Sequence, residues 1–143
     1  MKKHKILFVD DEEYILNSLK RLFLDEECEV YTANNSFDAI KLLDEYEFAL
    51  ILSDYRMPEL NGVEFLKLAK KKSPDTIRII LTGFSDVNVT VSAINEGEIY
   101  TFITKPWDND DLRVQIKRLV ELYELLNERK ELLKTIKTQN EEL

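Results

Sequence analysis

The sequence has few of the features that mark secreted, membrane-spanning or nucleic-acid-binding proteins. Its 143 residues include one cysteine, Cys28, so no internal disulfide can form. There is no signal peptide and no apolar run long enough to cross a bilayer, so we expect a cytoplasmic protein without a membrane segment. Lysine and arginine number 20 against 28 aspartates and glutamates, and the net charge of −8 argues against a general nucleic-acid-binding surface.

What the sequence does contain is a regular alternation of short apolar runs and amphipathic segments. Short apolar runs are typical of strands that are buried on both faces, and strands alternating with helices imply a parallel sheet covered by helices on both sides. Five such units fit the doubly wound order 2-1-3-4-5 of an α/β, flavodoxin-like fold. The expected strands are Lys5–Val9, Cys28–Ala33, Ala49–Ser53, Ile77–Leu81 and Tyr100–Thr104. The expected helices are Glu13 to about Asp25, a segment capped by Ser36, Gly62 to about Lys72, Val87–Glu96 and a last helix from about Asp108.

The last predicted helix carries an apolar pattern that continues well beyond the sheet-packing part. Its seven-residue repeat comprises Leu112, Leu119, Leu126, Leu133 and Asn140, with Leu122, Ile136 and Leu143 at the partner positions. Ile116 and Tyr123 widen the stripe in the first half, after which it narrows to a coiled-coil seam that Arg129 weakens. We therefore expect one domain over residues 1–122 and a helical extension over 123–143, directed toward a homodimer partner or an output domain. A single long surface helix is the alternative.

Polar side chains follow four of the predicted strands. In an open parallel sheet, ligands bind beyond the carboxyl ends of the strands, where the winding reverses. The first strand is followed by Asp10 and Asp11, the third by Asp54, the fourth by Thr82 and the fifth by Lys105. These groups are therefore expected to meet at one edge of the sheet.

The chemistry of this set favours phosphoryl transfer. Three carboxylates that lie close together repel one another unless one is protonated or a cation binds. Mg2+ suits oxygen ligands, and no cysteine or histidine lies near these positions to favour Zn2+. A carboxylate nucleophile beside Mg2+, a lysine and a hydroxyl can attack phosphorus in line while the cations neutralise the transferring oxygens.

The segments ILFVDDE, ILSDYRMPELNG, ILTG and FITKPW, in this order, resemble the receiver domain of two-component response regulators over about Lys5 to Leu122. The resemblance implies that Asp54 is the phosphoacceptor, supplied by a histidine kinase or a phosphotransfer protein. It also implies that Asp10, Asp11 and Asp54 bind Mg2+ together with the backbone carbonyl of Arg56. The implied activity is regulatory, limited to self-phosphorylation and slow dephosphorylation.

The same resemblance implies a switch. Thr82 is the hydroxyl drawn toward the phosphoryl group, Lys105 contacts that group, and Phe102 is the aromatic residue that follows Thr82. The face made by the fourth helix, the fifth strand and the last helix is then repacked. The Lys105–Pro106 peptide bond is expected to be cis, as is common in the family. Taken alone, an aromatic residue such as Phe102 more often belongs to the core.

Some positions depart from the commonest family pattern. Gly83 stands where a small alanine or serine is usual, and Phe102 replaces the frequent tyrosine. Arg56 and Phe84 are bulky and flank the pocket mouth, so the resemblance does not fix the lifetime of the phosphoryl group.

Two other functions stay open. A phosphatase of the haloacid dehalogenase type also uses a strand-end aspartate and Mg2+, but it needs a second acid two residues later, where this chain has Arg56. A degenerate receiver acting as a phosphorylation-independent scaffold is the other, although every expected pocket residue is present. The stretch TGFSDVNVTVSAINEGEIYTFITKPW is similar to receivers that precede cyclic-dinucleotide phosphodiesterase or similar output domains, and we expect the chain to be part of a longer regulator.

Overall fold

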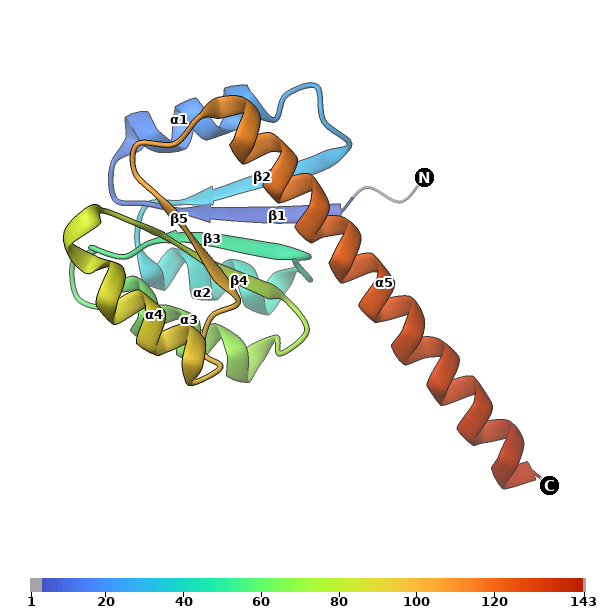
Figure 1. Cartoon of the computed structure of the whole chain (residues 1–143). Helices are drawn as coiled ribbons and strands as arrows, with labels where there is room; N and C mark the ends of the chain where they lie inside the picture. The colour runs from blue at the N-terminus through green and yellow to red at the C-terminus, as the bar shows by residue number, and fades with distance from the viewer. Residues whose placement is uncertain (1–3, 143) are drawn as a thin grey trace.

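Residues 4–142, which the computed structural model describes, form a five-stranded parallel sheet in the order β2-β1-β3-β4-β5. This arrangement confirms the predicted α/β fold and strand order (Figure 1). The strands are β1 (His4–Val9), β2 (Cys28–Ala33), β3 (Leu50–Asp54), β4 (Ile77–Thr82) and β5 (Thr101–Thr104). The helices are α1 (Glu13–Leu22), α2 (Ser36–Glu45), α3 (Gly62–Lys72), the short 3-10 helix η1 (Phe84–Asp86), α4 (Val87–Asn95) and α5 (Asn109–Glu142).

The sheet is covered by helices on both faces, because successive side chains of a strand point to opposite sides. In β1, Ile6 and Phe8 belong to the core cluster formed with α1 and α5. Leu7 and Val9 belong to the cluster formed with α2, α3 and α4. Figure 1 shows the same two layers, with α1 and α5 on one side of the sheet. Burial on both faces explains why the central strands read as continuous apolar runs.

Helix α1 ends at Leu22, earlier than the expected limit near Asp25. Lys20 and Arg21 lie in its last turn, where positive charge is favoured by the helix dipole. The acidic run 25–27 comes next, and negative charge is disfavoured at this end of a helix. The charge sequence therefore explains the early stop.

The prediction that Ser36 caps the second helix is wrong. Asn35 is the cap residue, with an extended backbone, and its side-chain oxygen accepts a hydrogen bond from the Asp38 amide at 2.8 Å. Ser36 is already helical, so its hydroxyl is not placed to bond the free amides of the first turn. That hydroxyl is buried, and within residues 4–142 it has no hydrogen-bond partner.

Helix α5 is 34 residues long and projects from the domain (Figure 1). Its first part packs into the core, and Tyr123, the first residue of the predicted extension, is still buried. Farther along, Lys130 forms an ion pair with Asp75 of the α3–β4 loop at 2.8 Å. Of the predicted heptad residues, Leu143 lies outside the described residues. No helix in the described part of the chain is both long and apolar enough to cross a membrane.

Candidate functional site

The register of the sheet brings the strand ends to one level. Val9 of β1 pairs with Ser53 of β3, so Asp10 and Asp54, the next residues of each strand, lie side by side. On the other side of β3, Asp54 pairs with Leu81 of β4, one residue before Thr82. The predicted edge is therefore a real feature of the fold.

Three aspartates gather at this edge. Asp10, Asp11 and Asp54 each offer a carboxylate oxygen, and these oxygens all lie within 4.8 Å of one another. Asp10 and Asp54 are buried, whereas Asp11 is exposed. The Glu12 amide donates to Asp10 Oδ1 at 2.9 Å and fixes that carboxylate at the start of α1. An all-oxygen donor set of this kind fits a hard divalent cation such as Mg2+.

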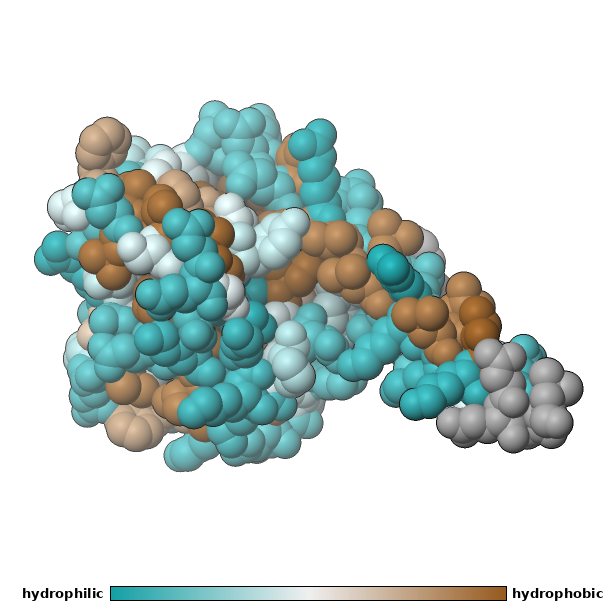
Figure 2. Space-filling model, turned by 60° about the horizontal axis from the view of Figure 1, so that its bottom comes forward, coloured by the Kyte–Doolittle hydropathy of each residue, from teal (hydrophilic) through white to brown (hydrophobic). Residues whose placement is uncertain are grey.

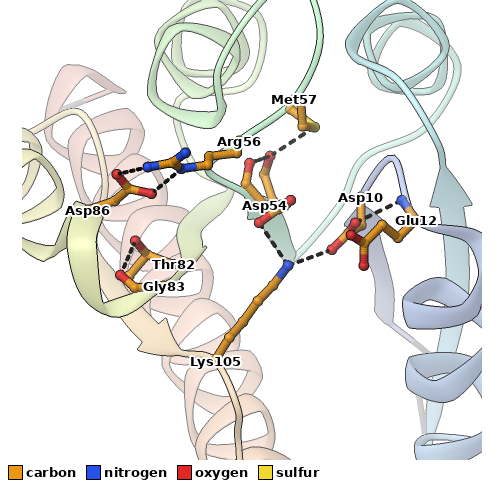
Figure 3. A network of polar contacts seen from close by, with 10 residues as sticks. Asp10, Glu12, Asp54, Arg56, Met57, Thr82, Gly83, Asp86 and Lys105 are labelled. Carbon is orange, nitrogen blue, oxygen red and sulfur yellow. Dashed lines mark hydrogen bonds and ion pairs between the residues drawn. The ribbon is translucent and has the colours of Figure 1, made fainter.

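Lys105 reaches into the same cluster from the loop after β5. Its Nζ lies 3.0 Å from Asp54 Oδ1 and 3.3 Å from Asp10 Oδ2, and Figure 3 shows it between the two carboxylates. The Lys105 amide donates to the carbonyl of Thr82 at 2.8 Å, which continues the pairing of β4 and β5 past the strand ends. The Lys105–Pro106 peptide bond is cis.

The charges at this edge are incompletely balanced. Burial, followed by the charge of Asp54, raises the pKa of Asp10 to about 6, although the Glu12 amide and Lys105 oppose the shift. Burial also raises the pKa of Asp54, because Lys105 offsets it only in part and Asp11 adds repulsion. Burial alone lowers the pKa of Lys105, but its hydrogen bond to Asp54 and the charge of Asp10 raise it overall. One ammonium group is shared by the carboxylates of Asp10 and Asp54, and Asp11 adds a third negative charge, so the cluster favours a further cation.

Thr82 and Phe102 lie at the same edge but apart from the carboxylates. Thr82 is fully buried, and its hydroxyl donates to the carbonyl of Gly83 at 3.2 Å (Figure 3). Phe102 is half-buried in β5 and packs against the core cluster on the α3 and α4 side of the sheet. The structure thus brings Asp10, Asp11, Asp54 and Lys105 together in one cluster.

Sequence reasoning missed a partner of Arg56. The Arg56 side chain points away from Asp54 and donates to Asp86, with Nε 2.8 Å from Oδ2 and Nη2 3.1 Å from Oδ1 (Figure 3). Asp86 is the last residue of η1, directly before α4. Because β3 and β4 are neighbours, the loops that follow them are adjacent. The predicted strand order therefore indicated that Arg56 and Asp86 lie near each other.

Gly62 allows α3 to begin directly against the site. Its amide donates to the Tyr55 carbonyl at 2.7 Å. A Cβ atom at this position would lie 2.3 Å from the backbone oxygen of Asp54 and 2.8 Å from Ile80 Cδ1. The glycine at the end of the M-P-x-x-x-G segment is therefore required by close packing against the backbone of Asp54.

Comparison with known proteins agrees with this architecture. Residues 6–117 match the response regulator receiver domain family, and the chain belongs to that family. The hydrogenase transcriptional regulatory protein HoxA of Bradyrhizobium diazoefficiens is 42% identical over 123 residues, which cover 86% of this chain and 25% of HoxA. The chain thus spans about a quarter of the length of this relative.

Two solved structures are similar over nearly the whole chain. An adenylate cyclase structure from Rhodopirellula baltica superposes with a TM-score of 0.88 at 33% identity, covering 93% of this chain and 98% of that one. The signal receiver domain of an HD domain-containing protein from Pseudomonas fluorescens Pf-5 superposes with a TM-score of 0.83 at 33% identity. The match covers 90% of this chain and 95% of that one. The chain is a receiver domain with a regulatory role.

Proposed function

We propose that Asp54 accepts a phosphoryl group from the phosphohistidine of a partner kinase or phosphotransfer protein, and that this modification switches the domain. The observation that carries the proposal is the convergence of Asp10, Asp11, Asp54 and Lys105 from three separate strand ends. Membership of the receiver family supports the same assignment.

The transfer itself requires few groups from the protein. A carboxylate oxygen of Asp54 forms a bond to phosphorus while the phosphorus–nitrogen bond of the donor breaks, and the imidazole nitrogen keeps the electron pair. Lys105 already contacts Asp54 and is placed to neutralise an oxygen of the arriving phosphoryl group. Asp10, Asp11, Asp54 and the backbone carbonyl of Arg56 would hold Mg2+, which when bound supplies positive charge to the phosphoryl oxygens.

The site is better suited to slow self-dephosphorylation than to multiple turnover as a phosphatase. A phosphatase of the haloacid dehalogenase type needs an acid two residues after the nucleophile, and this position holds Arg56. The guanidinium is bound to Asp86, and an arginine does not release a proton near neutral pH. Turnover of a simple phosphate ester by the purified domain would contradict this choice.

The switch that we propose uses Thr82 and Phe102. The Thr82 hydroxyl donates one hydrogen bond, to the backbone carbonyl of Gly83. Rotation of the side chain can therefore turn the hydroxyl toward a phosphoryl oxygen on Asp54. Phe102 is half-buried on the neighbouring strand and can occupy the space that this movement vacates. The movement would alter the surface that α4, β5 and α5 share.

For the partner, we propose a second copy of the chain bound along α5. Tyr123 and Lys130 lie seven residues apart on the side of α5 that faces the domain. Tyr123 is buried in the core, and Lys130 forms the ion pair with Asp75. The part of the heptad seam that lies beyond Tyr123 is centred roughly a quarter of a helical turn away from that side. Its residues Leu126 and Leu133 are 50% and 56% exposed, and Figure 2 shows apolar side chains along the projecting part of α5. A parallel two-stranded coiled coil would bury this seam.

The phosphorylation proposal can be tested with acetyl phosphate as donor. Wild-type protein incubated with Mg2+ and acetyl phosphate should gain a single phosphoryl adduct by intact mass, and EDTA should prevent it. Asp54→Asn should abolish the adduct, whereas Asp44→Asn, which changes an exposed aspartate paired with Lys72, should keep it. An adduct that persists in Asp54→Asn would refute the assignment.

A further inference from the structure

The Arg56–Asp86 ion pair lies beside the proposed phosphorylation site (Figure 3). It joins the β3–α3 loop to the last residue of η1, with Nε and Oδ2 2.8 Å apart. Arg56, Asp86 and Asp11 also line one surface cavity of about 560 Å3. The pair therefore borders the same hollow as Asp11, the exposed member of the carboxylate cluster.

The two partners differ in their freedom to move. The Arg56 side chain is 72% exposed, whereas that of Asp86 is 12% exposed. Asp86 is held by its backbone, since its amide donates to the Gly83 carbonyl at 3.2 Å and its carbonyl accepts from Thr90 Oγ1 at 2.9 Å. If the pair breaks, the guanidinium is therefore the group that moves first.

We propose that Arg56 exchanges ion-pair partners: Asp86 holds its guanidinium away from Asp54 in the unmodified domain, and a phosphoryl group on Asp54 takes the guanidinium from Asp86. This inference rests on the proposed phosphorylation of Asp54. It gives the phosphoryl group a second cationic side chain, Arg56, in addition to Lys105. It also links phosphorylation to the loss of an ion pair at the start of α4.

Physical chemistry favours the exchange. A phosphoryl group carries a charge of about −1.5 to −2, larger than that of a carboxylate, and offers three acceptor oxygens. Guanidinium groups match phosphate oxygens in a bidentate geometry. The guanidinium side of the competing ion pair is 72% exposed, so solvent screens part of its attraction to Asp86. Arg56 is two residues from Asp54, so a change of side-chain rotamer is the movement required.

The exchange would also transmit the state of the site to α4. When Arg56 leaves, Asp86 keeps a largely buried charge without its guanidinium partner. Such a charge is unfavourable unless it gains water or the amides of a helix N-terminus. Asp86 directly precedes α4, so the start of this helix is the segment that would adjust.

Beryllofluoride, a phosphoryl mimic, provides the test on the full chain in Mg2+. Its affinity can be followed through Trp107, the sole tryptophan of the sequence, which lines a cavity together with Lys105. Asp86→Asn removes the competing charge at nearly constant shape, so beryllofluoride should bind about 2- to 5-fold more tightly. The matched control Asp44→Asn, which also breaks an ion pair of 2.8 Å, should leave the affinity unchanged.

A second variant separates the exchange from a general effect of Asp86. In an Arg56→Gln background, Asp86→Asn should give no gain in affinity, because no guanidinium remains to be released. Equal or weaker binding by Asp86→Asn than by wild type would overturn the inference, as would a gain that survives in the Arg56→Gln background. Wild-type protein that binds no beryllofluoride would instead overturn the proposed function, and this inference with it.

Discussion

The Nζ atom of Lys105 lies 3.0 Å from Oδ1 of Asp54, although Asp54 ends β3 and Lys105 follows β5. The same nitrogen is 3.3 Å from Oδ2 of Asp10, so a single ammonium group is shared by two buried carboxylates. This relationship defines the electrostatics of the site, because any bound cation must compete with Lys105 for the same oxygens.

Replacement of Lys105 by alanine should therefore have opposite effects on metal affinity and on stability. Mg2+ should bind several-fold more tightly, because the competing positive charge is gone. In EDTA the variant should lose about 1–3 kcal/mol of unfolding free energy, because two buried carboxylates lose their counter-charge. Calorimetric Mg2+ titration and urea unfolding measure the two effects.

The control for this variant is Lys5→Ala. Lys5 also pairs with a carboxylate, that of Glu29 at 3.2 Å, but it lies near the start of β1, at the opposite end of the strand from Asp10. It should leave Mg2+ affinity unchanged. Equal Mg2+ affinities for Lys105→Ala and wild type would contradict the sharing of Lys105 with the metal ligands.

Stability without metal should depend on pH through Asp10. Its pKa is raised from 3.8 to about 6, so the folded protein binds this proton more tightly than the unfolded chain does. The unfolding free energy should therefore fall as pH rises toward 6 and then level off, by about 1 kcal/mol between about pH 5 and pH 7.5 from this group. The pKa of Asp54 is also raised, which acts in the same direction.

Asp10→Asn should remove this component of the pH dependence. In EDTA at neutral pH the variant should be more stable than wild type, because a buried charge has become a neutral amide of the same shape. Urea unfolding at several pH values measures both effects, with Asp44→Asn as the variant that should follow wild type. Two results together would contradict the charge balance described for the site. They are a wild-type unfolding free energy that rises over the same pH interval, and the same dependence on pH in Asp10→Asn.

Two glycines beside the site should respond oppositely to alanine. Gly62→Ala places a Cβ atom 2.3 Å from the backbone oxygen of Asp54 and should destabilise the domain by about 2–4 kcal/mol. Gly83→Ala meets no atom within 4 Å and has an extended backbone, so it should be neutral or stabilise by up to about 1 kcal/mol. Thermal unfolding compares the two directly, and similar melting temperatures would be evidence against the close packing of α3 on β3.

Self-association through α5 should depend on one side of the helix. Leu133→Lys places a charge in the heptad seam and should weaken a dimer by at least about tenfold. Thr135→Lys adds the same charge two residues later, outside the seam, where the exposed Thr135 hydroxyl donates to the Glu131 carbonyl. Sedimentation velocity over a concentration series distinguishes them. Equal association of the two variants would argue against this seam as the interface.

The fold was predictable because its information is local. Each buried strand is a short apolar run, and each parallel strand ends at the same edge, so the positions of Asp10 and Asp54 followed from the alternation and the doubly wound strand order. Lys105 could be placed at that edge for the same reason. Its contact with both carboxylates depends on the length and direction of one flexible side chain, which the pattern of strands does not determine.

Features that depend on details of backbone geometry were less accessible. Asn35 and Ser36 are both good capping residues, and only the backbone conformation at each shows that Asn35 is the cap. Arg56 and Asp86 belong to no periodic pattern, and their pairing requires the approach of two loops. The acidic run after α1 did contain a stop signal that an apolar-face prediction overlooked.

Reduction of the phosphorylated protein with borohydride tests the central claim most directly. Borohydride converts an aspartyl phosphate to homoserine, which peptide mapping by mass spectrometry locates to a single residue. After incubation with Mg2+ and acetyl phosphate, we predict homoserine at position 54 and aspartate at positions 10 and 11. Homoserine at another position, or unmodified Asp54 in protein that carries the phosphoryl adduct, would contradict the account.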